Sequence, residues 1–228
     1  LNDIELTDIS LQHDDNPRDR LVESVKFRAA LDERLVIDDM DILAKGLAAN
    51  LQGHLGLESP FELLMAIEGR FEVAGETGES LIELPFQLES FGDLDKMDLK
   101  LISEKFGLQL NAELLEPVSI PAWDAQVLLN RLEWPQDDMD PDFTLKGLKI
   151  NSQGSLDDWS IVVDSGLDAL QLKDARFSVA GSGSINTITI SKATVTGAGV
   201  DLGFGGKVGW SNQTGADLKA VIRQLDLS

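Results

Sequence analysis

The 228-residue sequence contains no cysteine and only two histidines. Without cysteine the chain cannot form a disulfide, a thiolate nucleophile or a cysteine-ligated zinc or iron–sulfur site. The absence also fits an oxidising compartment, in which free thiols are a hazard. His13 and His54 lie far apart in the sequence, and neither belongs to a metal-binding or catalytic motif. We therefore expect no catalytic residue, no metal site and no cofactor, and we do not expect an enzyme.

Positive charge is also scarce. Lysine and arginine together number 19 against 40 aspartates and glutamates, so the formal net charge is -21. Proteins that grip nucleic acids need clustered cations to neutralise phosphates, and we therefore expect no nucleic-acid partner. For the same reason we do not expect a polybasic dock onto anionic lipid headgroups. Hydrophobic residues make up 43% of the chain, which argues against general disorder.

Long apolar segments are missing as well. No apolar run approaches the roughly 18 to 20 residues that a membrane-spanning helix needs. The chain starts with Leu1 and Asn2, without a methionine, a basic region or an apolar leader, and it ends at Ser228. Both ends look like cut points, so we expect a fragment of a longer protein.

What the sequence does contain is apolar and polar residues that alternate with a period of two, repeated many times along the chain. This period predicts β-strands, because successive side chains of a strand point to opposite faces of a sheet. We therefore expect an all-β fold with little helix, built as a long, curved, mainly antiparallel sheet. The candidate residues of its apolar face are Phe61, Leu63, Met65, Ile67, Phe71, Ile82, Leu84, Phe86, Phe106, Leu108, Leu110, Val200, Leu202, Phe204, Val208 and Trp210.

Two stretches carry a mixed signal. Residues 18–35 combine helical spacing with strand alternation, and residues 122–133 follow a proline that could open a helix, although we prefer a strand there. An acidic, proline-containing turn near residues 136–142 could mark a domain boundary. The strand pattern has the same character on both sides of it, so we expect residues 1–228 to form a single continuous segment with a loop at that turn.

The apolar residues that alternate along the expected strands allow two interpretations. They fill the dry interior of an ordinary β-sandwich or barrel, or they line a trough whose apolar face meets lipid. Composition alone does not decide between these.

An ordered succession of short motifs bears on this choice. Leu-Glu-Trp-Pro stands at 132–135, Phe-Thr-Leu-Lys-Gly-Leu at 143–148, Gly-Ser-Leu-Asp-Asp-Trp at 154–159, Gly-Ser-Gly-Ser-Ile at 181–185 and Gly-Gly-Lys-Val-Gly-Trp at 205–210. The succession resembles the TamB family, large subunits of the translocation and assembly module within the AsmA-like superfamily. Residues 121–127 look like a strand opening of that family. The similarity is best over residues 118–228 and extends back to residue 40, whereas the first 35 residues carry little of it.

The resemblance implies a taco-like β-groove with an apolar inner face, of which this chain is an interior stretch. It implies a full-length protein in the periplasm of a Gram-negative bacterium, anchored in the inner membrane. Other parts of that protein would meet a TamA-like partner in the outer membrane. The implied function is to conduct phospholipids between the two membranes, with phospholipid acyl chains on the candidate residues above, and to support outer-membrane assembly.

Two alternatives remain beside this hypothesis. One is a scaffold or chaperone that offers sheet edges to outer-membrane β-barrel proteins during their assembly or secretion. The other is a β-rich binding module with a dry core.

Overall fold

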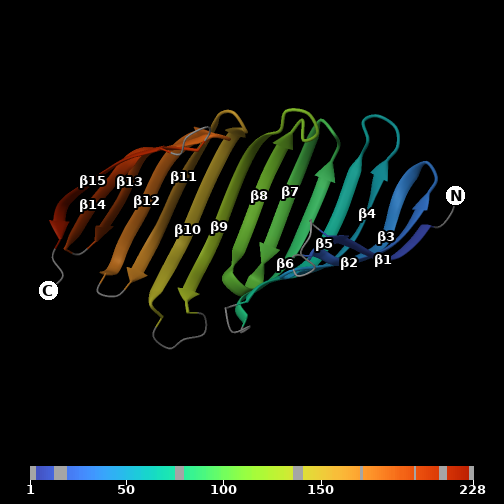
Figure 1. The fold of residues 1–228 in the computed structure, drawn as a ribbon, viewed down its shortest axis with the longest axis horizontal. Helices are drawn as coiled ribbons and strands as arrows, with labels where there is room; N and C mark the ends of the chain where they lie inside the picture. Colours follow the sequence, from blue (N-terminus) through green and yellow to red (C-terminus); the bar gives the residue numbers. More distant parts are fainter. Residues whose placement is uncertain are drawn as a thin grey trace. The chain divides into compact units, whose positions relative to one another are not determined.

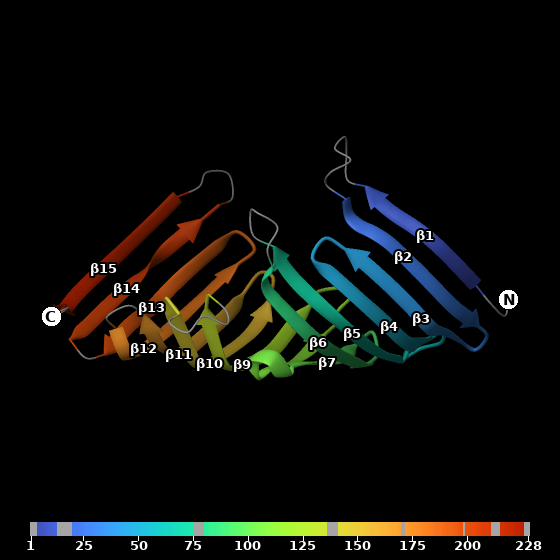
Figure 2. The same ribbon diagram turned by 90° about the horizontal axis from the view of Figure 1, so that it is seen from below.

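The computed structural model describes residues 4–12, 20–74, 80–135, 141–169, 172–197, 199–210 and 215–225. Two compact units make up the chain, Leu1–Lys105 (unit 1) and Phe106–Ser228 (unit 2). Each unit is an open, curved antiparallel sheet in which strands that follow one another in sequence lie side by side (Figures 1 and 2). The prediction of an all-β, mainly antiparallel fold is therefore confirmed.

The described residues of unit 1 form seven strands. They are β1 (Ile4–Gln12), β2 (Arg20–Leu31), β3 (Arg34–Ala44), β4 (Leu47–Gly56), β5 (Leu63–Ala74), β6 (Ser80–Gly92) and β7 (Lys96–Ser103). The mixed pattern at 18–35 resolves as the strand β2. Phe27 there pairs with Met40 of β3, so tertiary pairing uses the alternation rather than the helical spacing.

In unit 2, the part of the chain that the structure describes forms eight strands. They are β8 (Leu108–Leu115), β9 (Ala122–Trp134), β10 (Phe143–Ser155), β11 (Trp159–Ala169), β12 (Leu172–Ser184), β13 (Thr187–Gly197), β14 (Val200–Gly209) and β15 (Gly215–Leu225). The strand preferred at 122–133 is confirmed as β9. Residues 136–140 of the expected loop lie outside the described part of the chain.

Two of the expected strands begin later than the alternation indicated. Phe61 lies in the turn before β5 with φ at 60°, and its N–H donates to the carbonyl of Glu58. Phe106 lies in the short 3-10 helix η1 (Glu104–Phe106) that precedes β8. Both residues keep the period of the strand that follows, which is why the sequence pattern included them.

Each sheet is a single layer. The only apolar residues that are buried, among those described, are Ala29, Leu51, Ala175, Ala193 and Val200. The accessible surface of the chain is 15101 Å², whereas a folded monomer of 24.8 kDa has about 10,200 Å². Substantial contacts between elements join only sequence neighbours in the described residues. The hypothesis that the apolar stripes fill the interior of a sandwich or closed barrel is therefore wrong for each unit.

Two glycines of β10 adopt backbone conformations that other residues avoid, for different reasons. Gly154, at the end of β10, has φ at 134°, and a Cβ there would lie 2.2 Å from the carbonyl oxygen of Asp158. Gly147 has φ at 60°, with no atom within 4 Å of the position of a Cβ. Gly154 is thus required both by its conformation and by a close approach, and Gly147 by its conformation alone.

Replacing each glycine by alanine should separate these two requirements. Gly147→Ala should lower the free energy of unfolding of unit 2 by about 1 kcal/mol, which is the usual penalty for an L-residue in the left-handed region. Gly154→Ala should lower it by about 3 kcal/mol or more, because a backbone clash is added to the strained conformation. All four tryptophans lie in unit 2, so urea unfolding followed by tryptophan fluorescence reports on this unit. Equal losses for the two variants would contradict the close approach at Gly154.

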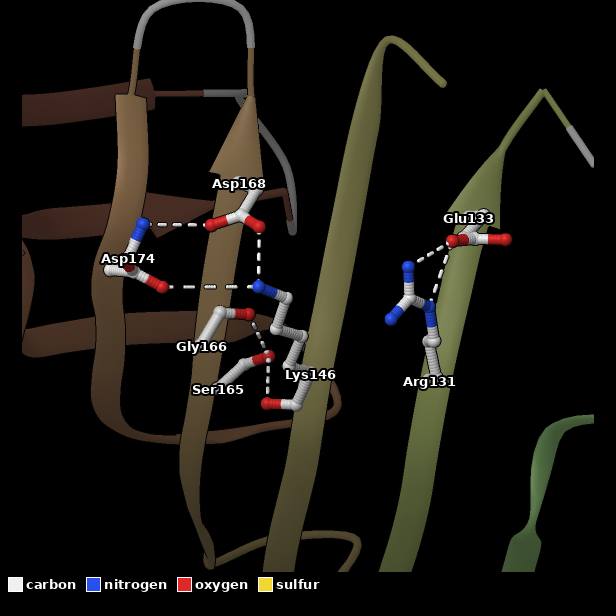
Figure 3. A network of polar contacts seen from close by, with 7 residues as sticks. All are labelled: Arg131, Glu133, Lys146, Ser165, Gly166, Asp168 and Asp174. Carbon is white, nitrogen blue, oxygen red and sulfur yellow. Dashed lines mark hydrogen bonds and ion pairs between the residues drawn. The ribbon is translucent and has the colours of Figure 1, made fainter. Parts of the chain in front are cut away.

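Lys146 of β10 links three strands of unit 2 on one face (Figure 3). Its Nζ forms an ion pair with Asp168 of β11 and lies 3.9 Å from Oδ1 of Asp174 of β12. The N–H of Asp174 donates to Oδ1 of Asp168 over 2.7 Å. The hydrogen bond from Lys146, and then the one from the Asp174 backbone, hold the pKa of Asp168 below its ordinary value of 3.8.

The lowered pKa gives a pH dependence with a defined sign. Because the folded-state pKa of Asp168 lies below the unfolded one, its ionised form stabilises the fold above the unfolded pKa. This contribution is lost as the pH falls through the folded-state pKa. Lys146→Gln should raise the pKa of Asp168, measured by carboxyl-carbon NMR titration. Asp174→Asn keeps the backbone donor and should leave that pKa nearly unchanged; a larger effect from Asp174→Asn would contradict this assignment.

Candidate functional site

The strand register of unit 1 gathers apolar side chains on one face of its sheet. Met65 of β5 pairs with Gly53 of β4 and Ser90 of β6, and Ile67 pairs with Leu51 and Leu88. Partners across a ladder share a face, so alternate residues of neighbouring strands form one surface, the unit 1 apolar face. Its large members are Val22, Val25, Phe27 and Leu31 on β2, Leu35, Ile37, Met40 and Ile42 on β3, Leu47, Leu51 and Leu55 on β4, Leu63, Met65, Ile67 and Phe71 on β5, Leu84, Phe86 and Leu88 on β6, and Met97, Leu99 and Leu101 on β7. None of the residues that these pairs place on the face is charged.

Most of the sequence-predicted residues of unit 1 belong to this face. Those on it are Leu63, Met65, Ile67, Phe71, Leu84 and Phe86, and Ile82 pairs with Val73 in the same ladder. The ring of Phe86 lies over Gly69, where a Cβ would come within 2.6 Å of its Cζ atom. Phe61 is exposed in the turn before β5 rather than in the row itself.

Unit 2 has a corresponding face, the unit 2 apolar face. Val127 of β9 pairs with Leu110 of β8 and Ile150 of β10, and Ile150 pairs with Val163 of β11. The large members of this face are Leu110 and Leu114 on β8, Trp123, Val127, Leu129, Leu132 and Trp134 on β9, Phe143, Leu145, Leu148 and Ile150 on β10, Trp159, Ile161, Val163 and Leu167 on β11, Phe177 and Val179 on β12, Ile188, Ile190 and Val195 on β13, Val200, Leu202, Phe204 and Val208 on β14, and Leu218 and Ile222 on β15. None of the residues that the described pairs place on this face is charged.

The sequence-predicted residues of unit 2 divide in the same way. Leu110, Val200, Leu202, Phe204 and Val208 lie on the unit 2 apolar face, and Leu108 joins them at the start of β8. Trp210 follows the end of β14, and its Nε1 donates to the carbonyl of Ile185 over 2.9 Å. Phe106 lies in η1, before the strand begins.

A bulge preserves the unit 2 apolar face where strict alternation would break it. Lys146 pairs with Gly166 and Lys149 with Asp164, so β10 carries one extra residue around Gly147. Leu145 and Leu148, three positions apart, therefore share the apolar face. A similar shift at Asp38 and Asp39 of β3 keeps Ile37 and Met40 on the unit 1 apolar face.

The apolar faces carry a few polar side chains, some of which are hydrogen-bonded within the sheet. On unit 2, the indole N–H of Trp123 donates to Oγ of Ser152 over 3.0 Å, and the hydroxyl of Ser165 donates to the carbonyl of Gly166 over 2.8 Å. On unit 1, Ser90 and Ser103 are buried, and their hydroxyls find no hydrogen-bond partner among the described residues. These groups add little polar surface, so what each face offers is an uncharged apolar wall.

The opposite face of each sheet carries the charge. Arg70 of β5 lies 3.5 Å from Glu83 of β6, and Arg176 of β12 lies 3.8 Å from Asp164 of β11. These pairs are solvent-exposed, so each contributes little to stability. Their main effect is to keep one side of a thin sheet hydrated, while the other side is available for apolar groups.

Much of both apolar faces, including the rows on β3, β4, β7 and β9 to β13, is not among the residues that the alternation predicted. The alternation of apolar and polar residues is present in these strands, but it is interrupted. Ile37 and Met40 are out of phase until the bulge between them is known, and the glycines of β4 and β12 leave gaps in the apolar rows. Alternation scored separately on each side of such a break would have found them.

The described residues offer little else to carry chemistry. Among them, no group of three or more histidines, aspartates or glutamates could hold a metal ion. None of the described helices has the length and hydrophobicity to cross a membrane. The two apolar faces can bind apolar groups along each sheet, and they are therefore the candidate site.

Comparison with known proteins identifies the family. A family model described as the N-terminal domain of TamB matches residues 1–228. No curated protein and no solved structure matches the chain. The match includes the first 35 residues, so the expectation that they carry little of the resemblance is wrong. It supports a role related to the translocation and assembly module of the Gram-negative envelope. The chain belongs to the TamB family.

Proposed function

We propose that the two apolar faces carry phospholipid acyl chains, as part of a conduit between the inner and outer membranes. The observation that supports this proposal is a sheet face in each unit on which the described strand pairs place no charged residue and over which no second layer of described residues packs. A soluble domain rarely leaves so much contiguous apolar surface uncovered unless that surface meets lipid or another protein. The candidate lining residues on β5, β6, β8 and β14 belong to these faces.

The energetics favour a continuous wall over a deep pocket. Each methylene kept from water is worth about 0.8 kcal/mol, so an acyl chain of about 16 carbons faces a barrier of about 12 kcal/mol in water. A long apolar face removes most of this barrier at every position along the path. Binding that is weak and uniform lets the chain slide, whereas one tight site would trap it.

The proposed setting follows from the family. The full-length protein would be anchored in the inner membrane, cross the periplasm and reach a TamA-like outer-membrane partner through parts outside this chain. In that setting the chain binds and conducts, and it catalyses no reaction. Its supply of lipid supports outer-membrane assembly and, through it, protein secretion.

A photo-crosslinking residue at Met65 should capture phospholipid in cells, whereas one at Leu64 should not. The two positions are adjacent on β5, but Met65 lies on the unit 1 apolar face and Leu64 on the opposite face. Mass spectrometry of the adducts identifies the captured molecule. Adducts of Met65 with polypeptides alone would favour the scaffold or chaperone function instead.

A charge placed on the apolar face should block lipid passage without unfolding the protein. Phe71 and Phe91 lie on neighbouring strands and are 43% and 47% exposed, but on opposite faces. Since both side chains already contact water, aspartate at either position should lower the melting temperature by only a few degrees. Phe71→Asp should abolish outer-membrane integrity in the full-length protein, because a passing acyl chain would have to desolvate the carboxylate.

Phe91→Asp is the matched control and should preserve outer-membrane integrity. Lipid co-purifying with each variant, measured by mass spectrometry, should fall severalfold for Phe71→Asp and stay unchanged for Phe91→Asp. Equal loss of function in both variants, or unfolding of Phe71→Asp alone, would count against an open apolar face.

A further inference from the structure

One end of the unit 2 sheet is edged by turns with exposed apolar residues. The strand register brings alternate turns of unit 2 to one end of its sheet: Ala122 pairs with Ser155, Trp159 with Gly183, and Thr187 with Gly209. The β8–β9, β10–β11 and β12–β13 turns and the end of β14 therefore lie at the same end of the strands (Figure 1). Their exposed apolar residues, together the apolar rim, are Val118 and Ile120 at 72% each, Leu156 at 50%, Ile185 at 58% and Trp210 at 45%.

Hydrogen bonds beyond the strands hold three of these turns in a row. The N–H of Ile185 donates to the carbonyl of Leu156 over 2.8 Å. Trp210 donates twice to the next turn, from its indole to the carbonyl of Ile185 over 2.9 Å and from its backbone to Asn186 over 3.0 Å. Leu156, Ile185 and Trp210 are therefore presented from a preorganised edge rather than from independent loops, and ordering this part of the rim on binding takes little further entropy.

The charge around the apolar rim has one sign. Glu116, Asp157 and Asp158 are exposed in the same turns, and the described turn residues at this end include no lysine or arginine. In unit 1, exposed leucines also stand beside carboxylates in the β4–β5 and β6–β7 turns, although Lys96 closes the second of these turns. Leu57 stands beside Glu58, and Leu94 lies between two aspartates. An apolar edge flanked by carboxylates favours an apolar partner surface with positive charge beside it.

The spacing of the turns indicates which kind of polypeptide fits. Successive turns at this end are two strands apart, which is about 9.6 Å. Seven residues of an α-helix advance about 10.5 Å and return to the same face. In an extended strand the same-face residues repeat every 6.7 Å or so, which does not match. A helix that places one residue of the same face on each of the three turns and on the end of β14 needs about 22 residues.

We propose that the apolar rim is a docking site for a basic amphipathic α-helix of a partner protein. Such a helix has an apolar residue at every seventh position, facing the turns, and lysine or arginine beside it, facing Glu116, Asp157 and Asp158. This surface is separate from the apolar faces proposed to carry lipid. The flanking carboxylates oppose insertion of the same residues into an anionic bilayer.

A synthetic helix tests the proposal directly. The probe is an alanine-rich peptide of about 24 residues with four leucines, one at every seventh position, and flanking lysines, labelled for fluorescence anisotropy. It should bind the full chain saturably and more weakly as salt is raised. A peptide with glutamate in place of each lysine should not bind. Leu156→Ser combined with Ile185→Ser should weaken binding of the lysine peptide roughly tenfold.

Two control variants locate the binding site. Val162→Ser removes a comparably exposed side chain from the polar face of β11 and should leave the affinity unchanged. Phe204→Asp alters the unit 2 apolar face and should also leave it unchanged, whatever it does to lipid binding. Tryptophan fluorescence melts verify that each variant is folded.

Several results would overturn the proposal. These are an absence of saturable binding, equal binding of the two peptides, or an equal loss with Val162→Ser. Loss with Phe204→Asp but not with the rim variant would place the peptide on the lipid face. Rim-dependent binding to phosphatidylglycerol vesicles, with no peptide binding, would show that the rim meets a membrane instead of a helix.

Discussion

The backbone hydrogen-bond ladder between neighbouring strands is the interaction on which the rest of this structure depends. Most proteins of this size are held by a core between two layers, but here only five described apolar residues are buried. Each strand is therefore stabilised by its two neighbours and by side-chain pairs across them. Stability in such an architecture is a sum of local interfaces, as in other repeat-like proteins. For this reason, glycines at close approaches between strands, such as Gly154, have the importance for stability that core residues have in a layered fold.

A single layer also constrains where charge can stand. The cross-strand ion pairs of Arg70 with Glu83 and of Lys146 with Asp168 both lie on the face opposite the apolar one. One charged residue among the paired positions of the apolar face would interrupt a surface that has nothing else to cover it. The net charge of -21 is thus concentrated where it keeps the sheet soluble.

Much of this fold could be predicted from alternation, because a period of two is the geometry of a strand. The alternation alone was sufficient to predict the row from Leu63 to Phe71. The stretch with a mixed helix and strand signal forms the strand β2 because it pairs with β3. What could not be predicted was where the period breaks. The bulge at Gly147 depends on the register with β11. The starts of β5 and β8 depend on the turn that contains Phe61 and on the 3-10 helix that contains Phe106, and neither is visible in the alternation because both residues keep its period. The apolar rim was invisible for a related reason. Val118 and Ile185 are far apart in sequence, and only the hairpin topology brings their turns to one end.

The consecutive order of the strands has a further consequence for how such a protein changes length. Since each strand pairs only with its sequence neighbours, adding or removing one whole hairpin leaves every other pairing intact. It changes the extent of a sheet by about 9.6 Å and returns the chain to the same end in the same direction. Gene duplication of a hairpin would thus lengthen the sheet by a fixed step. Such steps would match a protein to the distance that it has to cover without changing the residues of either face.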